Sequence, residues 1–191
     1  RFEYASGGRL AGIISSRGEF LKVETDESGR VLCVSVNQDG EEVKLVRYRY
    51  DDRGDMVETL DALDVSKHFV YSGGHLLVQL TNQGGMSFHW EYEGKGENAR
   101  CVHTWGDGGV MEYFIHYGKG YTHIRNGENA ETEYYYGEDK LIYKIVDANG
   151  GITRHQYNSF QELEVTVNPE GYTRKTSYNE FGLPVRITDE N

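Results

Sequence analysis

The sequence has few prolines, few cysteines and no long apolar run. It contains 2 Pro and 2 Cys in 191 residues. No apolar run approaches the ~20 residues that a membrane-spanning helix needs, so membrane insertion is not expected. Leu, Ile, Val and Phe together make roughly 23% of the chain, near the low edge of the range for globular proteins. A thick two-layer core is therefore hard to build from this sequence.

Positive charge is also scarce. The chain has 20 Lys and Arg against 31 Asp and Glu, a formal net charge of −11, and its basic residues do not cluster. Proteins that bind a phosphate backbone carry basic patches, so we expect no nucleic-acid partner. The chain begins Arg1-Phe2-Glu3-Tyr4, without Met or a signal-like segment, and we expect it to be a piece of a longer protein.

Tyrosine and glycine are abundant, at 15 and 24 residues, and they recur at a fixed spacing. Tyr136, Tyr157 and Tyr178 stand 21 residues apart. Between them lie two segments that begin with Asp or Asn and end with Gly, 147–150 and 168–171. Asx in the first position and Gly in the last are typical of type I turns. Each unit is therefore predicted to be a strand, a turn, a second strand and a second turn.

The same spacing extends to the N-terminus. The nine register positions are Tyr4, Thr25, Tyr50, Tyr71, Tyr92, Tyr117, Tyr136, Tyr157 and Tyr178. Two intervals are stretched to 25 residues, around 37–40 and 105–109, and one is shortened to 19. We expect these length changes to fall at turns. Because no linker interrupts the series, residues 1–191 are predicted to be a single array of roughly 16 strands.

Alternation of apolar residues assigns the faces of the strands only in part. The apolar residues of 163–167 lie on one face, as do those of 183–187. The two sets are one residue out of phase relative to Tyr157 and Tyr178. Either a β-bulge intervenes or both faces are partly covered, and the sequence leaves both possibilities open.

The repeated phrases resemble RHS repeats, also called YD repeats. The resemblance is carried by Tyr50-Asp51-Asp52-Arg53-Gly54, by the degenerate forms at 4–8 and 25–29, and by the phrase from Tyr178 to Val185. It implies an all-β fold, in which an antiparallel ribbon of about eight 21-residue repeats forms a curved arc of a hollow spiral shell. The repeat-motif residues expected to have structural roles are Tyr50, Asp51, Gly54, Tyr71, Tyr92, Tyr136, Gly150, Tyr157, Gly171, Tyr178 and Gly182.

The resemblance also implies a function. RHS repeats form the shells of bacterial polymorphic Rhs toxins, the cocoon of insecticidal Tc complexes, and animal teneurins. The implied role is a structural shell segment that encloses and insulates a C-terminal toxin or effector domain before delivery. The implied setting is a protein secreted or delivered from a bacterial cell, or held at its surface, such as a type VI secretion effector used in bacterial competition. The implied partners are the remaining repeats, the enclosed domain and components of a secretion apparatus.

The teneurin branch implies an alternative, a cell-surface adhesion module that binds carbohydrate or protein. The sequence has no Asn-x-Ser/Thr acceptor for N-glycosylation, which favours a bacterial source over an animal ectodomain. A row of tyrosines spaced by 21 residues, Tyr71, Tyr92, Tyr113 and Tyr134, is the candidate sugar-binding surface. We favour the interpretation that these tyrosines pack against cross-strand neighbours and hold the sheet together.

No catalytic residue, cofactor site or metal site is predicted, and the chain is not expected to be an enzyme. His68 and His89 occupy equivalent positions with one strand between them, about 9.5 Å apart. That distance is too long for a shared zinc ion, whose His ligands lie about 2.0–2.1 Å from the metal. The acidic turns lack the ligand series of a calcium loop. No nucleophile elbow or phosphate-binding loop occurs.

The two cysteines are predicted to be free thiols. Cys33 and Cys101 lie in units three apart along the array. With two strands per unit, the path between them is about 29 Å. A disulfide requires Cα atoms within about 7 Å of each other.

Overall fold

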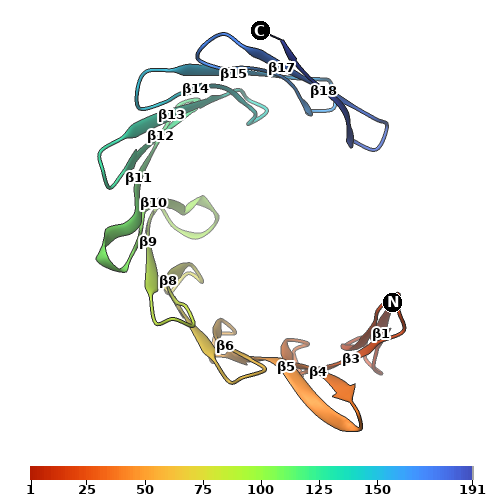
Figure 1. Ribbon diagram of the computed structural model, residues 1–191. Coiled ribbons are helices and arrows are strands. Elements are labelled where there is room, and N and C mark those ends of the chain that lie inside the picture. The colour runs from red at the N-terminus through yellow and green to blue at the C-terminus, as the bar shows by residue number, and fades with distance from the viewer. Residues whose placement is uncertain (191) are drawn as a thin grey trace. The chain divides into compact units, whose positions relative to one another are not determined.

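The structure, a computed structural model, describes residues 1–190 as a succession of antiparallel strands joined by short turns (Figure 1). The chain forms two compact units, the first comprising residues 1–90 and 95–98, the second residues 91–94 and the chain from residue 99 onward. Residues 1–190 contain no α-helix, and their helical structure is limited to single 3-10 turns, η1 (Gly96–Asn98) and η2 (Asp107–Gly109). The predicted all-β fold of repeated antiparallel strands is confirmed.

Each strand of the first unit pairs with the next strand in the sequence, so the unit is a β-meander. The strands are β1 (Phe2–Tyr4), β2 (Leu10–Ile14), β3 (Phe20–Thr25), β4 (Val31–Gln38), β5 (Glu41–Tyr50), β6 (Met56–Asp61), β7 (Ser66–Tyr71), β8 (Leu77–Thr81) and β9 (Ser87–Glu93). The last three residues of β9 are grouped with the second unit.

The second unit is a meander of the same kind. Its strands are β10 (Arg100–Gly106), β11 (Val110–Gly118), β12 (Tyr121–Asn126), β13 (Glu131–Tyr136), β14 (Ile142–Val146), β15 (Ile152–Tyr157), β16 (Leu163–Val167), β17 (Thr173–Tyr178) and β18 (Pro184–Glu190). Every register position lies at or next to the end of an odd-numbered strand. One strand precedes the first interval and one follows the last, which explains why eighteen strands form where roughly sixteen were expected.

One turn geometry joins most of the strands. In the turn at 147–151, the Gly150 N–H donates to the Asp147 carbonyl at 2.9 Å, and the Asp147 N–H donates to the Gly151 carbonyl at 2.9 Å. The Asp147 carboxylate accepts further bonds from the N–H groups of Asn149 and Gly151. Gly150 has a φ of 82°. This is a type I turn followed by a left-handed residue that forms a bulge, a common hairpin connection that suits the twist of the strands.

The first long interval departs from the prediction that length changes fall at turns. Its extra residues lengthen β4 and β5 to 8 and 10 residues. The connection between them is shortened to the two residues Asp39 and Gly40, which have φ values of 53° and 90°. The positive φ at both residues matches a type I′ turn, which supports longer paired strands. The prediction was wrong here because added residues that continue the ladder gain backbone hydrogen bonds.

β-Bulges explain why the apolar runs at 163–167 and 183–187 are out of phase with each other. The pairing register shifts between Gln156 and Tyr157 and again between Ser177 and Tyr178. Val165 pairs with Lys175, whereas Ile187 pairs with Thr176, the next residue on the same strand. Successive residues of a strand point to opposite faces, so the two apolar runs lie on opposite faces. Of the two possibilities left open by the sequence, the bulges occur, whereas Leu183, Val185 and Ile187 are exposed and their face is not covered there.

Cross-strand pairing defines one face of each unit, here called the tyrosine face. In the first unit Val23, Val34 and Val46 lie opposite one another on three successive strands, on the face of Tyr48 and Tyr50. In the second unit the tyrosine face carries Tyr113, Ile115, Tyr117, Ile124, Thr132, Tyr134 and Tyr136. The other face of each unit, here called the polar face, carries most of the paired charges, because opposite residues in a ladder share a face.

A single layer of strands leaves little of the chain buried. Within residues 1–190 the buried side chains are Val23, Cys33, Ser35 and Asp55. The accessible surface is 13230 Å², whereas a compact monomer of this mass would expose about 9,300 Å². Cohesion must therefore come from the ladder hydrogen bonds, the turns and the side-chain pairs between neighbouring strands.

Candidate functional site

The register tyrosines fasten neighbouring strands together. The hydroxyl of Tyr157 donates to the carbonyl of Ile142 at 3.0 Å, and the hydroxyl of Tyr178 donates to that of Leu163 at 2.8 Å. Each accepting carbonyl belongs to the first residue of the preceding strand. Tyr50, Tyr117 and Tyr136 make the same kind of bond. The ring covers apolar surface while the hydroxyl satisfies a backbone acceptor near the strand end.

Equivalent turns of successive repeats also contact each other. Asp55, which is 8% exposed, accepts from the Arg53 guanidinium at 2.9 Å and lies 2.7 Å from Nδ1 of His75. Arg53 also donates to the carbonyl of Ser72 at 3.1 Å. On another pair of turns, Gln83 donates to the Asp61 carboxylate at 2.7 Å. The turns are thus structural joints between repeats, in addition to reversing the chain.

The predicted motif residues lie at these joints and strand ends. Gly54, Gly150, Gly171 and Gly182 occupy the left-handed position of their turns, with φ values of 89°, 82°, 92° and 73°. Asp51 accepts the N–H groups of Arg53 and Asp55 at its own turn. Tyr71 ends β7 and Tyr92 lies near the end of β9. Burial raises the pKa of both phenols. The nearby Asp55 carboxylate raises the pKa of Tyr71 further, and Cys101 does the same for Tyr92.

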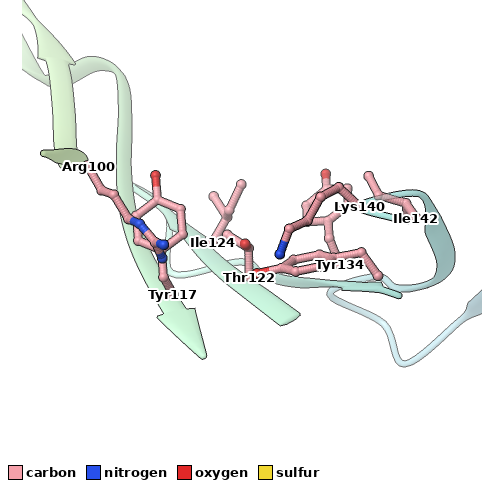
Figure 2. Close-up of a pocket in the computed structure, with 8 residues that line it drawn as sticks. Arg100, Tyr117, Thr122, Ile124, Tyr134, Lys140 and Ile142 are labelled. Carbon is pink, nitrogen blue, oxygen red and sulfur yellow. The ribbon is translucent and has the colours of Figure 1, made fainter. Parts of the chain in front are cut away.

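The tyrosine face of the second unit contains a shallow hollow of about 570 Å³. It is lined by Tyr117, Thr122, Ile124, Tyr134, Tyr136 and Ile142, together with two cationic side chains, Arg100 and Lys140. Figure 2 shows Arg100 beside Tyr117 at one side and Lys140 above Tyr134 at the other, both extending toward the middle. We call this cavity the cationic hollow.

Both cations of the cationic hollow rest on aromatic rings rather than on carboxylates. The Arg100 guanidinium lies 5.3 Å from the centre of the Tyr117 ring, and Nζ of Lys140 lies 5.4 Å from the centre of the Tyr136 ring. Within residues 1–190 neither side chain forms an ion pair. Cation–π contacts hold such groups in place without neutralising their charge.

The proposed row of tyrosines does not form between the third and fourth members. Tyr113 pairs with Asn126 of β12, whereas Tyr134 pairs with Thr122 of the same strand. The two rings are therefore displaced by four residues along β12. The displacement arises because the stretched interval shifts Tyr113 away from the register position, which is held by Tyr117. The sequence spacing of 21 was misleading here.

The polar face carries His68, His89, His103, His116 and His123, whereas His155 lies on the tyrosine face with Tyr157. One strand, β8, separates His68 from His89, as predicted, but His68 pairs with Thr81 and His89 with Gln79. His116 and His123 face each other across β11 and β12, a pairing that the sequence analysis missed. No group of three or more His, Cys, Asp or Glu side chains among the described residues could hold a metal ion.

His103 is part of an aromatic and ionic cluster on the polar face. Its ring stacks on Trp105 and on Phe114, with centroids 4.2 Å apart in each case. Its Nε2 lies 3.0 Å from the Glu112 carboxylate and its Nδ1 lies 3.4 Å from Glu91. Each ring nitrogen already faces an acceptor, so His103 joins neighbouring strands and has no free nitrogen for a ligand.

Both cysteines are free in the structure. Cys33 is buried on β4 and Cys101 is partly buried on β10. Burial raises the pKa of both thiols. Since the thiolate is the reactive form, neither site has the features of a catalytic cysteine.

These features define a class of protein, a structural repeat protein built as a single layer of antiparallel strands whose joints recur at a fixed interval. No family model matches the chain. Over 151 residues it is 23% identical to a probable deoxyribonuclease, RhsB, from Dickeya dadantii (strain 3937). The match covers 78% of this chain and 10% of the relative. The repeats, the meander and the similarity to this relative are consistent with an RHS-repeat protein.

Solved structures that match the chain at low similarity include Tc toxin components. A crystal structure of TcdB2-TccC3-TEV matches at 10% identity with a TM-score of 0.30, covering 99% of this chain and 16% of the other. The Photorhabdus luminescens Tc holotoxin pore matches at 10% identity with a TM-score of 0.29. The chain thus spans a small part of each protein it resembles. No helix in residues 1–190 is long and apolar enough to cross a membrane.

Proposed function

We propose that this chain is a wall segment of an RHS-repeat shell, which encloses and insulates a toxin or effector domain until that domain is delivered from a bacterial cell. Its role is structural and non-enzymatic. Its partners are further repeats of the same array and the enclosed domain, and components of a secretion apparatus deliver the assembly. The single array predicted for residues 1–191 is part of this proposal.

The observation that carries the proposal is the single layer of strands. A sheet with an apolar tyrosine face and no second layer in either unit is suited to separating two compartments. A globular enzyme would instead place its reactive groups in a deep, desolvated pocket. The hydroxyl bonds of Tyr157 and Tyr178, and the bond between Arg53 and Asp55, stabilise the contacts between neighbouring strands and turns. Such contacts are what a continuous wall of repeats requires. Adhesion through a tyrosine row receives less support, since Tyr113 and Tyr134 are out of line.

The test uses the polypeptide encoded by the complete reading frame that contains this array. Limited proteolysis is followed by mass spectrometry, with the intact protein compared against a variant carrying Gly54→Val and Gly171→Val, which strains two turns of the array. We expect a domain outside the array that survives proteolysis in the intact protein and is cleaved in the variant. Equal cleavage in both proteins, or a reading frame without any such domain, would refute the shell.

A further inference from the structure

The cationic hollow is a local concentration of positive charge in an acidic chain, whose formal net charge is −11. Some basic side chains form ion pairs, as Arg30 does with Asp26 and Arg174 does with Asp189. Arg100 and Lys140 form none among residues 1–190, and both line the same depression. Two unneutralised cations beside an aromatic and aliphatic surface favour a ligand that is both anionic and apolar.

The two cationic side chains of the hollow come from separate parts of the fold. Arg100 is the first residue of β10, and Lys140 occupies the left-handed position of the turn before β14, with a φ of 65°. That conformation costs free energy in a residue with a long side chain, because only Gly adopts it readily. The strained position directs Lys140 over Tyr136. Between the cations, Ile124 and Ile142 supply the apolar surface.

The lining also separates an acidic peptide from a sugar. No carboxylate, amide or imidazole side chain lines the cationic hollow, so its side-chain acceptors are limited to the hydroxyl oxygens of Tyr117, Thr122, Tyr134 and Tyr136. A sugar presents hydroxyl donors that need acceptors. A peptide that alternates acidic and aliphatic side chains needs cationic donors and apolar surface, which this site offers.

From these observations we propose that the cationic hollow binds an acidic, aliphatic segment of a polypeptide. Arg100 and Lys140 bind the carboxylates by charge-assisted hydrogen bonds. Ile124, Ile142 and the face of Tyr134 cover the aliphatic side chains. The site is a binding function of the chain in its own right and does not depend on the wall role proposed above.

The experiment measures binding of fluorescent peptides to the 191-residue chain by anisotropy. The probe is a short peptide alternating glutamate with leucine, and the comparison peptides alternate lysine with leucine and glutamate with serine. We expect the glutamate–leucine peptide to bind at least tenfold more tightly than either comparison peptide. We also expect its affinity to fall as salt is added, since exposed charge pairs are screened.

Substitutions then test whether the peptide binds at the cationic hollow. Lys140→Met and Arg100→Met keep the apolar stems and remove the charges, and each should weaken binding by about tenfold. Lys144→Met is the matched control, because Lys144 rests over the Tyr135 ring, 3.4 Å from its centre, on the opposite face. It should leave the affinity within twofold. Circular dichroism verifies that each variant is folded.

Three results would overturn the proposal. One is equal binding of the glutamate–leucine and lysine–leucine peptides. Another is a loss in Lys144→Met as large as that in Lys140→Met. The third is displacement of the peptide by oligogalacturonate at lower concentrations than by the unlabelled peptide itself, which would make the hollow a site for acidic sugars.

Discussion

A single backbone conformation recurs at thirteen turns within residues 1–190. In each, the fourth residue has a positive φ and donates its N–H to the first. Eight of these positions hold Gly. The other five hold Asp64, His75, Asn129, Lys140 and Gln161. An L-residue in this conformation costs about 1 kcal/mol relative to Gly. At these positions, replacing Gly with another residue should therefore lower stability, whereas replacing another residue with Gly should maintain or raise it.

Gly150→Val and Gln161→Gly form a matched pair at equivalent turns. No heavy atom lies within 4 Å of a Cβ placed on Gly150, so the cost of Gly150→Val is backbone strain alone. We expect it to lower the free energy of unfolding by more than about 1 kcal/mol. Gln161→Gly removes strain and should leave stability unchanged or raise it by up to about 1 kcal/mol. Urea titration followed by circular dichroism measures both. A stable Gly150→Val variant would contradict the role assigned to this glycine.

Tyr157→Phe isolates the hydroxyl bond of a register tyrosine. It removes the donor to the Ile142 carbonyl and keeps the ring. The expected loss of stability is about 1 kcal/mol. Tyr143→Phe is the control, because Tyr143 is half exposed and has no hydrogen-bond partner among the described residues. Equal effects of the two substitutions would show that the register hydroxyls do not fasten the strands.

Asp61 makes the turn at 61–65 sensitive to acid. The N–H groups of Val65 and Leu63 bond its carboxylate and hold its pKa below the usual 3.8. Since the folded pKa is the lower one, the contribution to stability is present above pH ~4 and is lost as pH falls through the folded value. Asp61→Asn keeps the acceptor oxygen and removes the titration. Below pH 4 the wild type should therefore lose stability relative to Asp61→Asn, as measured by thermal melts. Parallel pH profiles would contradict this assignment.

At the scale of strands and turns, the repeat is two strands long. Ile142 and Leu163, 21 residues apart, open equivalent strands, and each accepts a register hydroxyl. Removing one whole repeat preserves the direction and the face of every later strand. Removing half a repeat reverses the next strand and interrupts the alternation of turns between the two edges. Stability in such arrays is approximately a sum of repeat and interface terms.

Deletions in the second unit test this symmetry. We expect a variant lacking residues 143–163 to fold, with a β-type circular dichroism spectrum and protected amides in β17. A variant lacking residues 147–157, which removes β15 and the turn before it, should lose that protection. Hydrogen exchange read by mass spectrometry distinguishes the outcomes. Equal protection in both deletions would show that the two-strand unit is not the unit of folding.

The sequence predicted strands and joints better than it predicted faces and sites. The phrase from Tyr50 to Gly54 marks its strand end and turn directly, because Tyr50 ends β5 while Asp51 and Gly54 hold the first and fourth positions of the turn. His75 was not predicted at a left-handed position, because Gly73 and Gly74 beside it suggest a different glycine turn. The lengthening of β4 and β5 was missed because ladder pairing depends on the partner strand. The residues within a turn determine its conformation, whereas the register between paired strands determines which residues share a face.

The cationic hollow could not be predicted from the sequence for the same reason. Arg100 and Lys140 are 40 residues apart and belong to no common motif. Both side chains line the hollow because β10 and the turn before β14 border the tyrosine face, and because Lys140 takes an uncommon φ. The pairing of His116 with His123 is equally invisible until the register of β11 and β12 is known.

At the scale of the whole molecule, neither unit has a central core among residues 1–190. Four buried side chains and an accessible surface of 13230 Å² leave most atoms within reach of water. Cys33 is an exception, because it is buried and burial raises its pKa. Its thiol should react slowly in the native protein, while Cys101 is less buried and should react faster.

Thiol counting tests this expectation. The denatured, non-reduced protein should show two reactive thiols. In the native protein at neutral pH, Cys101 should be labelled before Cys33, with Cys33→Ser and Cys101→Ser used to assign the two phases. An intramolecular disulfide in the non-reduced sample would contradict both the free thiols and the path length expected for a ribbon.

The bulged turn has a consequence for how such a chain evolves. Its hydrogen bonds run between backbone groups, and within this one chain its first position is filled by Ala, Ser, Asp, Asn or Gly and its left-handed position by six residue types. The copies have diverged from one another while keeping a common geometry. A fold specified mainly by peptide groups can therefore lose its sequence signature long before it loses its shape, so distant descendants are easier to detect from the spacing of their joints than from the residues that occupy them.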